Sequence, residues 1–328
     1  MNASRDELFA RALGRRAFLR GAATLTAAGA AAVAVACGDG GDSRPEGTAT
    51  VAPDGTPGMG GTPAAGGRIS PRLLTREFVL NENNRFLVGL LDDKGGFVEN
   101  AKVELRFYKI GSDGMTGSFR RGGEASFLKL SLESHPDEQV PFYGVVAPFD
   151  EPGSWGVEII VTPADGSAGA QVQIPFDVLE QYETPANGQM APKSVNDTVE
   201  TTANRESLCS RNPQCDLHDR VIADLVGAGR PFVVQFSTPA FCETRFCGPV
   251  LDVVLDKVDE YRDRVDFVHI EVWQDFQTRI ARPAIGEWNL PTEPYTFFVR
   301  GDGTVAGRLE SIFTTQELVE HLDALLRS

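Results

Sequence analysis

The sequence predicts a multidomain chain with two folded parts, an all-β part over residues 68–182 and an α/β part over residues 206–328. Before residue 180, short runs alternate apolar and polar side chains, a period of two that is typical of half-buried strands. After residue 206, helical periods and continuous apolar runs follow one another, as in an α/β unit. The polar, irregular residues 183–205 lie between the two patterns, and we expect them to form a linker.

The predicted β part has the pattern of an immunoglobulin-like sandwich. Val103, Leu105 and Phe107 alternate with charged residues, and six or seven runs of this kind are separated by turn residues between positions 85 and 178. Its histidine, His135, lies in a polar loop without a second candidate ligand, so it does not predict a metal site. We therefore expect a spacer, docking or substrate-presenting module.

Paired arginines near the N-terminus indicate an export signal. Arg15 and Arg16 precede large apolar residues and then an uncharged, alanine-rich run that ends at Ala36. This pattern resembles a bacterial twin-arginine signal. The run has about 16 residues, fewer than the roughly 20 that a membrane-spanning helix needs. Residues 1–37 are therefore expected to hold a cleaved signal rather than a membrane helix.

A lipid-anchor site follows this signal. The residues Ala34-Val35-Ala36-Cys37 are similar to the lipobox of bacterial lipoproteins, in which the cysteine becomes the lipid-modified first residue of the mature chain. Residues 38–67 consist almost entirely of Gly, Pro, Ala, Thr, Ser and Asp, which cannot bury enough apolar surface to offset the entropy of ordering. The sequence thus predicts a membrane-anchored lipoprotein of the bacterial cell envelope, with a disordered tether before the folded parts.

The α/β part is expected to form a βαβ unit followed by a hairpin and a helix. The expected helices are Leu217–Val226, Val250–Tyr261 and one that Thr314 and Glu317 would cap; the expected strands are Pro231–Phe236, Val265–Val272, Tyr295–Arg300 and Val305–Leu309.

Two motifs in this part carry a family resemblance. A strand leads through Ser237-Thr238-Pro239-Ala240-Phe241 to Cys242, and Cys247-Gly248-Pro249 opens the next helix. Over roughly the last 120 residues, this arrangement resembles the thioredoxin superfamily, in particular its TlpA, ResA and Sco-like thiol–disulfide domains. The resemblance implies a thioredoxin-like fold and a cis-proline beside the cysteines. Pro294, before the Phe297-Phe298-Val299 strand, matches that position, and Pro291 is the alternative.

The resemblance also implies a thiol–disulfide oxidoreductase or redox chaperone that uses Cys242 and Cys247. A thiol at a helix N-terminus lies near unpaired backbone N–H groups, whose partial positive charge stabilises the thiolate that performs exchange. The family usually has two residues between its cysteines and this chain has four, so either cysteine could attack. Gln235 replaces a buried carboxylate that relays protons in the family. The implied partners are envelope proteins with thiols or disulfides.

The other close cysteine pair, Cys209 and Cys215, precedes the first expected helix of this part. An oxidising compartment favours a structural disulfide, and a relay between two dithiols is the alternative. Because this helix should begin at the same end of the sheet as the strand before Cys242, we expect the two pairs to lie near each other.

A copper-binding chaperone is the alternative function. Thiol exchange needs no cofactor, but Sco-like proteins resemble this chain in a cysteine pair at the strand exit and a distant histidine. The resemblance implies Cys242, Cys247 and His269 as copper ligands, with His218 as another candidate, because thiolate and imidazole ligands suit copper. Zinc is the less favoured ion, and a non-catalytic binding protein is also compatible with these residues.

The net charge of −15 argues against a nucleic-acid partner, because phosphate binding requires a concentrated Lys and Arg surface. The expected partners are therefore envelope proteins and, through the lipid at Cys37, the membrane.

Replacing the predicted lipidation site tests the anchor. We expect Cys37→Ser to move the protein from the membrane fraction to the soluble fraction, because no lipid can then be attached. The measurement is fractionation of cells, with mass spectrometry of the mature N-terminus. A wild-type protein that is soluble, or that begins at another residue, would contradict the prediction.

Overall fold

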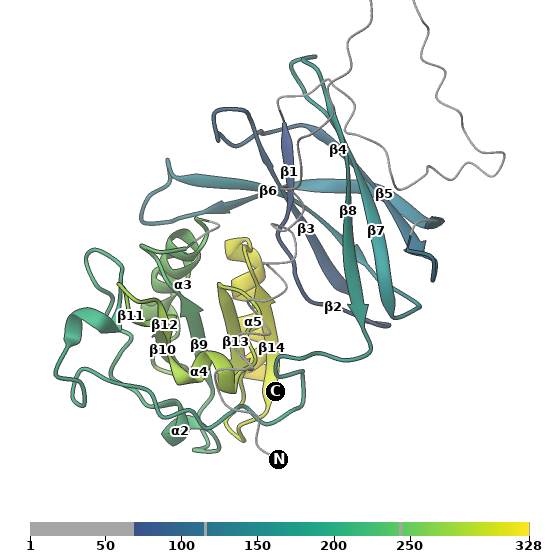
Figure 1. Ribbon diagram of the computed structural model, residues 1–328. Helices are drawn as coiled ribbons and strands as arrows, with labels where there is room; N and C mark the ends of the chain where they lie inside the picture. Colours follow the sequence, from purple (N-terminus) through teal and green to yellow (C-terminus); the bar gives the residue numbers. More distant parts are fainter. Residues whose placement is uncertain (1–68, 115–116, 243–244, 328) are drawn as a thin grey trace, which may run out of the picture. The chain divides into compact units, whose positions relative to one another are not determined.

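β-Strands hold more of the described chain than helices do (Figure 1). The computed structural model describes residues 69–114, 117–242 and 245–327. The predicted signal with Arg15 and Arg16, the lipidation site Cys37 and the tether at 38–67 lie outside these residues.

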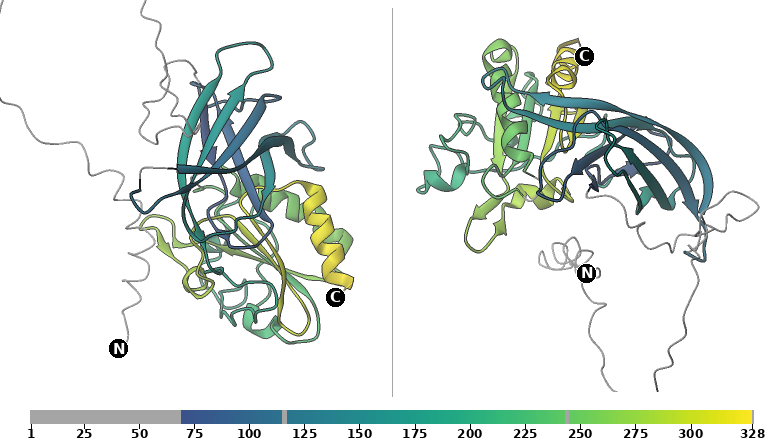
Figure 2. Two further views of the ribbon diagram at one scale, coloured as in Figure 1. Left: turned by 90° about the vertical axis from the view of Figure 1, so that its right-hand side faces the viewer. Right: turned by 90° about the horizontal axis from the view of Figure 1, so that it is seen from above.

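The first eight strands form one sheet, in the order β1-β3-β6-β5-β4-β7-β8-β2. Their bounds are β1 Ser70–Leu73, β2 Phe78–Val79, β3 Asn84–Leu91, β4 Lys102–Ile110, β5 Gly117–Ser131, β6 Gln139–Ala147, β7 Gly153–Thr162 and β8 Ala170–Leu179. Figure 2 shows how this sheet curls.

Aromatic side chains fill the inside of the curled sheet. The Phe86 ring stacks on Phe78 at 4.9 Å and meets the Phe107 ring edge-on at 4.8 Å. Trp155 is also buried here, and its indole N–H donates to the Glu151 carbonyl at 2.9 Å. Val103, Leu105 and Phe107 are buried as the alternating pattern predicts, because successive side chains of a strand face opposite sides.

The rest of the chain contains a four-stranded sheet, in the order β10-β9-β13-β14. Its strands are β9 Phe232–Ser237, β10 Asp266–Glu271, β13 Tyr295–Val299 and β14 Val305–Glu310; a separate hairpin consists of β11 Trp273–Asp275 and β12 Ile280–Ala281. The helical segments are η2 Arg205–Leu208, α2 Ile222–Leu225, α3 Cys247–Tyr261, α4 Pro283–Glu287 and α5 Thr315–Arg327.

Helices α3 and α5 lie side by side (Figure 1), and the Tyr261 hydroxyl on α3 donates to Asp323 on α5 at 3.1 Å. Val254 of α3 and Leu322 of α5 enter one apolar cluster that also contains Leu130 and Phe142 of the eight-stranded sheet. At the start of α5 the expected cap is confirmed, because Thr314 and Glu317 bond each other's backbone N–H groups.

The immunoglobulin-like sandwich predicted for residues 68–182 is wrong, because the eight strands form one curled sheet rather than two packed sheets. Strand β5 is the physical reason. Its first part, to Ala125, pairs with β4, and its second part, from Ser126, pairs with β6. One long strand therefore joins halves that a sandwich would keep separate.

The α/β thioredoxin-like domain predicted for residues 206–328 is not supported either. Of the helix expected at Leu217–Val226, only the four residues of α2 are helical. The main chain bonds elsewhere: Leu217 O accepts from His269 N at 2.8 Å, and His218 O accepts from Val199 N at 2.9 Å. Carbonyls that bond neighbouring segments do not close helical turns, so the apolar spacing here reflects burial without a helix.

A buried polar network joins the segment before β2 to β14. Glu77 accepts from Arg308 at 2.7 Å and from the Thr184 hydroxyl at 2.8 Å. Glu310, the last residue of β14, accepts from the backbone N–H groups of Arg76 at 2.6 Å and of Glu77 at 3.3 Å. Arg308 thus pairs directly with Glu77, whereas Glu310 is held by two backbone N–H groups.

Burial raises the pKa of Glu310 from its ordinary 4.5 to about 7, against the hydrogen bonds from Arg76 and Glu77 and the charge of Arg308, which lower it. The folded state therefore favours the protonated carboxyl. This stabilisation is fully present below the unfolded pKa of about 4.5 and is lost as the pH rises through about 7.

We therefore expect Glu310 to lower the free energy of unfolding by on the order of 2–3 kcal/mol as the pH rises from about 4.5 to about 7. In Glu310→Gln, a neutral amide replaces the carboxyl and should remove most of this slope. Urea unfolding across the pH range measures the effect. The exposed Glu180 is the matched control, because Glu180→Gln should leave the slope unchanged. Equal slopes in wild type and Glu310→Gln would show that Glu310 does not titrate in this range.

Candidate metal centre

Two cysteines and two histidines converge where β10 meets the irregular chain before α2. Cys209, Cys215, His218 and His269 form this group, which we name the Cys2His2 cluster, and their ligand atoms all lie within 4.8 Å of one another. Three of the four side chains are buried and Cys215 is half-buried. A buried group of sulfur and imidazole nitrogen atoms could hold a metal ion.

The spacing of these atoms fits tetrahedral coordination. Metal–sulfur bonds of about 2.3 Å and metal–nitrogen bonds of about 2.0 Å at tetrahedral angles place two sulfurs about 3.8 Å apart and a sulfur and a nitrogen about 3.5 Å apart. The Cys209 and Cys215 sulfurs are 3.8 Å apart. His269 Nδ1 lies 3.6 Å from Cys209 Sγ and 3.3 Å from Cys215 Sγ, and His218 Nε2 lies 3.2 Å from Cys215 Sγ.

The parallel pairing of β9 with β10 orients His269. Its Nε2 lies 2.9 Å from the Ser237 hydroxyl and 3.2 Å from the Ser237 carbonyl, at the end of β9. Because a carbonyl only accepts, Nε2 carries the proton when it bonds this oxygen, and the Nδ1 lone pair is left facing the two sulfurs. A histidine whose second nitrogen is held in this way is typical of metal ligands.

Hydrogen bonds also fix the loop that carries the cysteines. Glu271, buried at the end of β10, accepts from the Ser210 backbone N–H at 2.8 Å. The Gln214 amide donates to the Cys209 carbonyl at 2.8 Å, and Arg211 pairs with Asp252 of α3 at 2.7 Å. The cluster is therefore held by its surroundings as well as by its own contacts.

The protonation pattern suits metal binding. A hydrogen bond from Cys215 lowers the pKa of Cys209, and the same contact raises the pKa of Cys215. Burial lowers the pKa of His218, which favours the neutral imidazole. One thiolate and a neutral imidazole are in the form that ligates, and a bound cation would displace the remaining thiol proton.

The sequence-predicted pair Cys242 and Cys247 lies where β9 leads into α3. Cys247 is the first residue of α3 and is buried, whereas Cys242 is half-buried. The Cys242 sulfur accepts from the Cys247 backbone N–H at 3.3 Å. Burial, then the hydrogen bond with Cys242, raises the pKa of Cys247 well above its ordinary value. Glu293, whose peptide bond to Pro294 is cis, adds to this rise through its charge.

None of the four cysteines in the described part of the chain is in a disulfide. Cys209 and Cys215 lie next to each other, as their predicted pairing requires, but at 3.8 Å rather than the roughly 2.05 Å of a bonded pair. His269 lies on a strand as expected, yet its ring contacts this pair, although the copper alternative grouped it with Cys242 and Cys247.

Sequence reasoning named every member of the Cys2His2 cluster but did not group them. The local signal was present, since Cys215-Asp216-Leu217-His218 places a histidine three residues after a cysteine. The helix predicted from Leu217 obscured it. The fourth ligand, His269, is brought in by strand pairing and has no sequence signal of its own.

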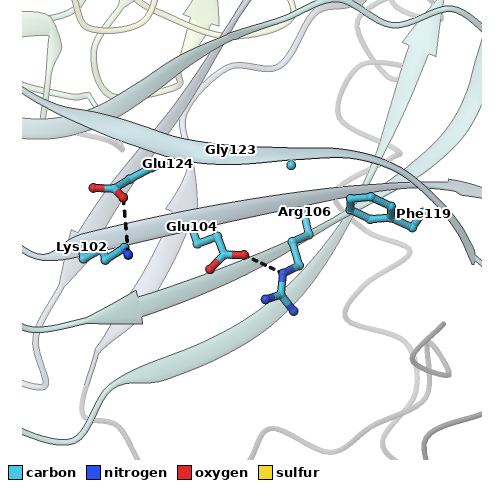
Figure 3. A pocket seen from close by; sticks show the side chains of 7 residues that line it. Lys102, Glu104, Arg106, Phe119, Gly123 and Glu124 are labelled. Carbon is cyan, nitrogen blue, oxygen red and sulfur yellow. Dashed lines mark hydrogen bonds and ion pairs between the residues drawn. The ribbon is translucent and has the colours of Figure 1, made fainter. Parts of the chain in front are cut away.

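A groove on the eight-stranded sheet, over β4 and β5, is lined by charged side chains that form ion pairs with one another (Figure 3). Lys102 lies 3.6 Å from Glu124, and Arg106 lies 2.8 Å from Glu104. Exposed ion pairs of this kind are typical of a solvated surface and do not indicate a ligand.

No protein-family model matches the sequence, and the comparison with curated proteins found no match. Among solved structures, FetP from uropathogenic E. coli strain F11, expressed in the periplasm, is 10% identical with a TM-score of 0.22, over 36% of this chain and 91% of that chain. A copper-bound variant of that protein is 12% identical with a TM-score of 0.23, over 40% of this chain and 96% of that one. Likenesses this weak carry no inference about this chain.

In the described part of the chain, none of the helices has the length and apolar character needed to cross a membrane.

Proposed function

We propose that this protein binds one d10 metal ion, zinc(II) or copper(I), at the Cys2His2 cluster, and that it does so outside the cytoplasm. The observation that carries the proposal is the agreement of four sulfur–sulfur and sulfur–nitrogen distances with a tetrahedral thiolate–imidazole site. The Ser237 contact on the second nitrogen of His269 supports it, because that contact leaves Nδ1 as a lone-pair donor.

The donor set restricts the ion. Thiolates select soft and borderline ions, and tetrahedral sites with two sulfur and two nitrogen ligands suit zinc(II). Copper(I) is also bound by soft thiolates, and it is the ion of the alternative function. Two thiolates and two neutral imidazoles carry a charge of about −2, which zinc(II) neutralises fully and copper(I) by half. Burial of the cluster therefore favours zinc(II), because uncompensated buried charge is costly.

The proposed location rests on the N-terminal sequence. The Arg15-Arg16 pair, the apolar run after it and Cys37 are in the order of an exported and acylated protein. In that setting the protein would hold its ion at the membrane surface, tethered through residues 38–67.

Thiol–disulfide exchange at Cys242 and Cys247 is the second candidate function. The observation that favours it is the N–H of Cys247, at the start of α3, which donates to the half-buried Cys242 sulfur. A donor at a helix N-terminus stabilises a thiolate, so Cys242 is the proposed attacking sulfur and buried Cys247 the resolving one. The proposed substrates are envelope proteins with thiols or disulfides.

Titration of the reduced protein with zinc(II) and, without oxygen, with copper(I) tests the metal site. We expect one ion per chain, measured by competition with a chromophoric chelator. Cys209→Ser, Cys215→Ser and His269→Asn should each weaken binding more than about 100-fold, because each removes a ligand. Ser237→Ala should weaken it by about 10-fold or less, because it removes the hydroxyl contact to His269 but keeps the contact to the Ser237 carbonyl.

The exposed His135 provides the matched control, and His135→Asn should bind as tightly as wild type. Cobalt(II), whose tetrahedral thiolate complexes are strongly coloured, gives an independent optical readout. A native Cys209–Cys215 disulfide, or one-to-one binding that survives loss of each ligand, would refute the metal site.

A trapping experiment tests the second candidate. We expect Cys247→Ser to accumulate mixed disulfides through Cys242, because the attacking sulfur remains and the resolving sulfur is absent. Cys242→Ser should trap far less, because Cys247 is buried. The measurement is non-reducing electrophoresis with mass spectrometry of the linked peptides. Equal trapping by both variants would contradict the assigned roles, stronger trapping by Cys242→Ser would reverse them, and no trapping by either would leave the dithiol without exchange activity.

A further inference from the structure

Two contacts join the loop after Cys209 to the segments that carry Cys242 and Cys247. The Ser210 hydroxyl accepts from the backbone N–H of Ala240, two residues before Cys242, at 3.1 Å. Arg211 pairs with Asp252, which lies on α3 five residues after Cys247, at 2.7 Å. The segments that carry the two thiols are thus linked to the first and second residues after Cys209.

A third connection runs through the main chain. Ser237, which orients His269, lies five residues before Cys242 in the segment that leaves β9. The segment that ends at Cys242 therefore contacts His269 of the cluster, through Ser237, and Ser210, the neighbour of Cys209, through Ala240. Movement of Cys242 toward α3 would displace this segment.

The described geometry belongs to the reduced protein, because none of the four described cysteines is in a disulfide. In this state the cluster distances fit a tetrahedral ion. Closing a disulfide brings two sulfurs to about 2.05 Å, closer than any hydrogen-bonded pair of thiols. The two cysteine side chains must move to form this bond. Any part of the movement that reaches Ser210 or Ser237 displaces the metal ligands, which tolerate only small displacements before affinity falls.

We propose that the redox state of Cys242 and Cys247 controls the metal site: the dithiol holds the ion, and the disulfide releases it. The inference deepens the proposed function and rests on it. We expect oxidation to weaken metal binding about 10-fold, within the usual range of coupling between two sites.

The oxidant belongs to the class of small-molecule disulfides. The Cys242 thiolate attacks one sulfur of the oxidant, which breaks its disulfide and releases one thiolate. Cys247, after losing its proton, attacks the mixed disulfide and releases the second thiolate, so that a Cys242–Cys247 bond forms. Two electrons pass to the oxidant, and the two protons of the dithiol end on the released thiolates.

Coupling of this kind is reciprocal. If the disulfide weakens metal binding 10-fold, a bound ion must favour the dithiol over the disulfide 10-fold. For this two-electron couple, 10-fold corresponds to a rise of about 30 mV in the reduction potential. Affinity and potential are measured independently and have to agree.

The test uses the full chain loaded with zinc(II), an ion without redox chemistry of its own. The protein is oxidised with oxidised glutathione and desalted, and mass spectrometry establishes the Cys242–Cys247 disulfide. Affinity is then measured by competition with a chromophoric chelator. We expect about 10-fold weaker binding than in the reduced protein, and a potential about 30 mV higher with zinc than without it.

The double variant Cys242→Ser, Cys247→Ser is the control for oxidation of the ligands themselves. It should bind zinc like the reduced wild type before and after oxidant. In Ser210→Ala, the link to Ala240 is lost, and the ratio of the two affinities should fall toward one.

Four results would overturn the proposal: a dithiol that does not close, equal affinity in the two redox states, an unshifted potential, or equal loss of zinc from the double variant. Each leaves the metal site standing. If the reduced protein binds no zinc or copper(I), the proposed function fails and the inference fails with it.

Discussion

The candidate site depends on the parallel pairing of β9 with β10. In that register Ser237 is paired with Glu271, and the two residues end adjacent strands. Ser237 bonds the ring of His269, and Glu271 bonds the backbone of Ser210 beside Cys209. One strand pair thus fixes a histidine ligand and the loop that supplies the cysteines. A shift of one residue in the register would turn these side chains to the opposite face of the sheet.

The sequence predicts the strands of this chain better than their assembly. The alternation of Val103, Leu105 and Phe107 identifies their burial, because side-chain period is a local property. Whether strands form one sheet or two depends on the partners of each strand. Strand β5 pairs with both β4 and β6, and its alternation of apolar and polar residues does not indicate this. The prediction of a sandwich was wrong for that reason.

The same distinction applies to the C-terminal part. The strands of the four-stranded sheet and the helices α3 and α5 lie close to their expected positions, since each has a clear apolar period. The helix expected from Leu217 fails because carbonyls there bond Val199 and His269, which are distant in the sequence. Such bonds cannot be read from residue spacing, and they are also what brings His218 to the other ligands. The error in fold and the missed grouping of the site therefore have one cause.

The apolar cluster under α3 and α5 has a consequence for how the molecule comes apart. Leu130 and Phe142 of the eight-stranded sheet and Val254 and Leu322 of the helices belong to the same cluster. Opening either sheet alone would leave part of this surface in water, which opposes partial unfolding. The two sheets should therefore unfold together, in a single cooperative transition. A substitution that destabilises the Cys2His2 cluster would then lower the stability of the whole described structure, including β3 and β6, which are distant from the cluster in the sequence.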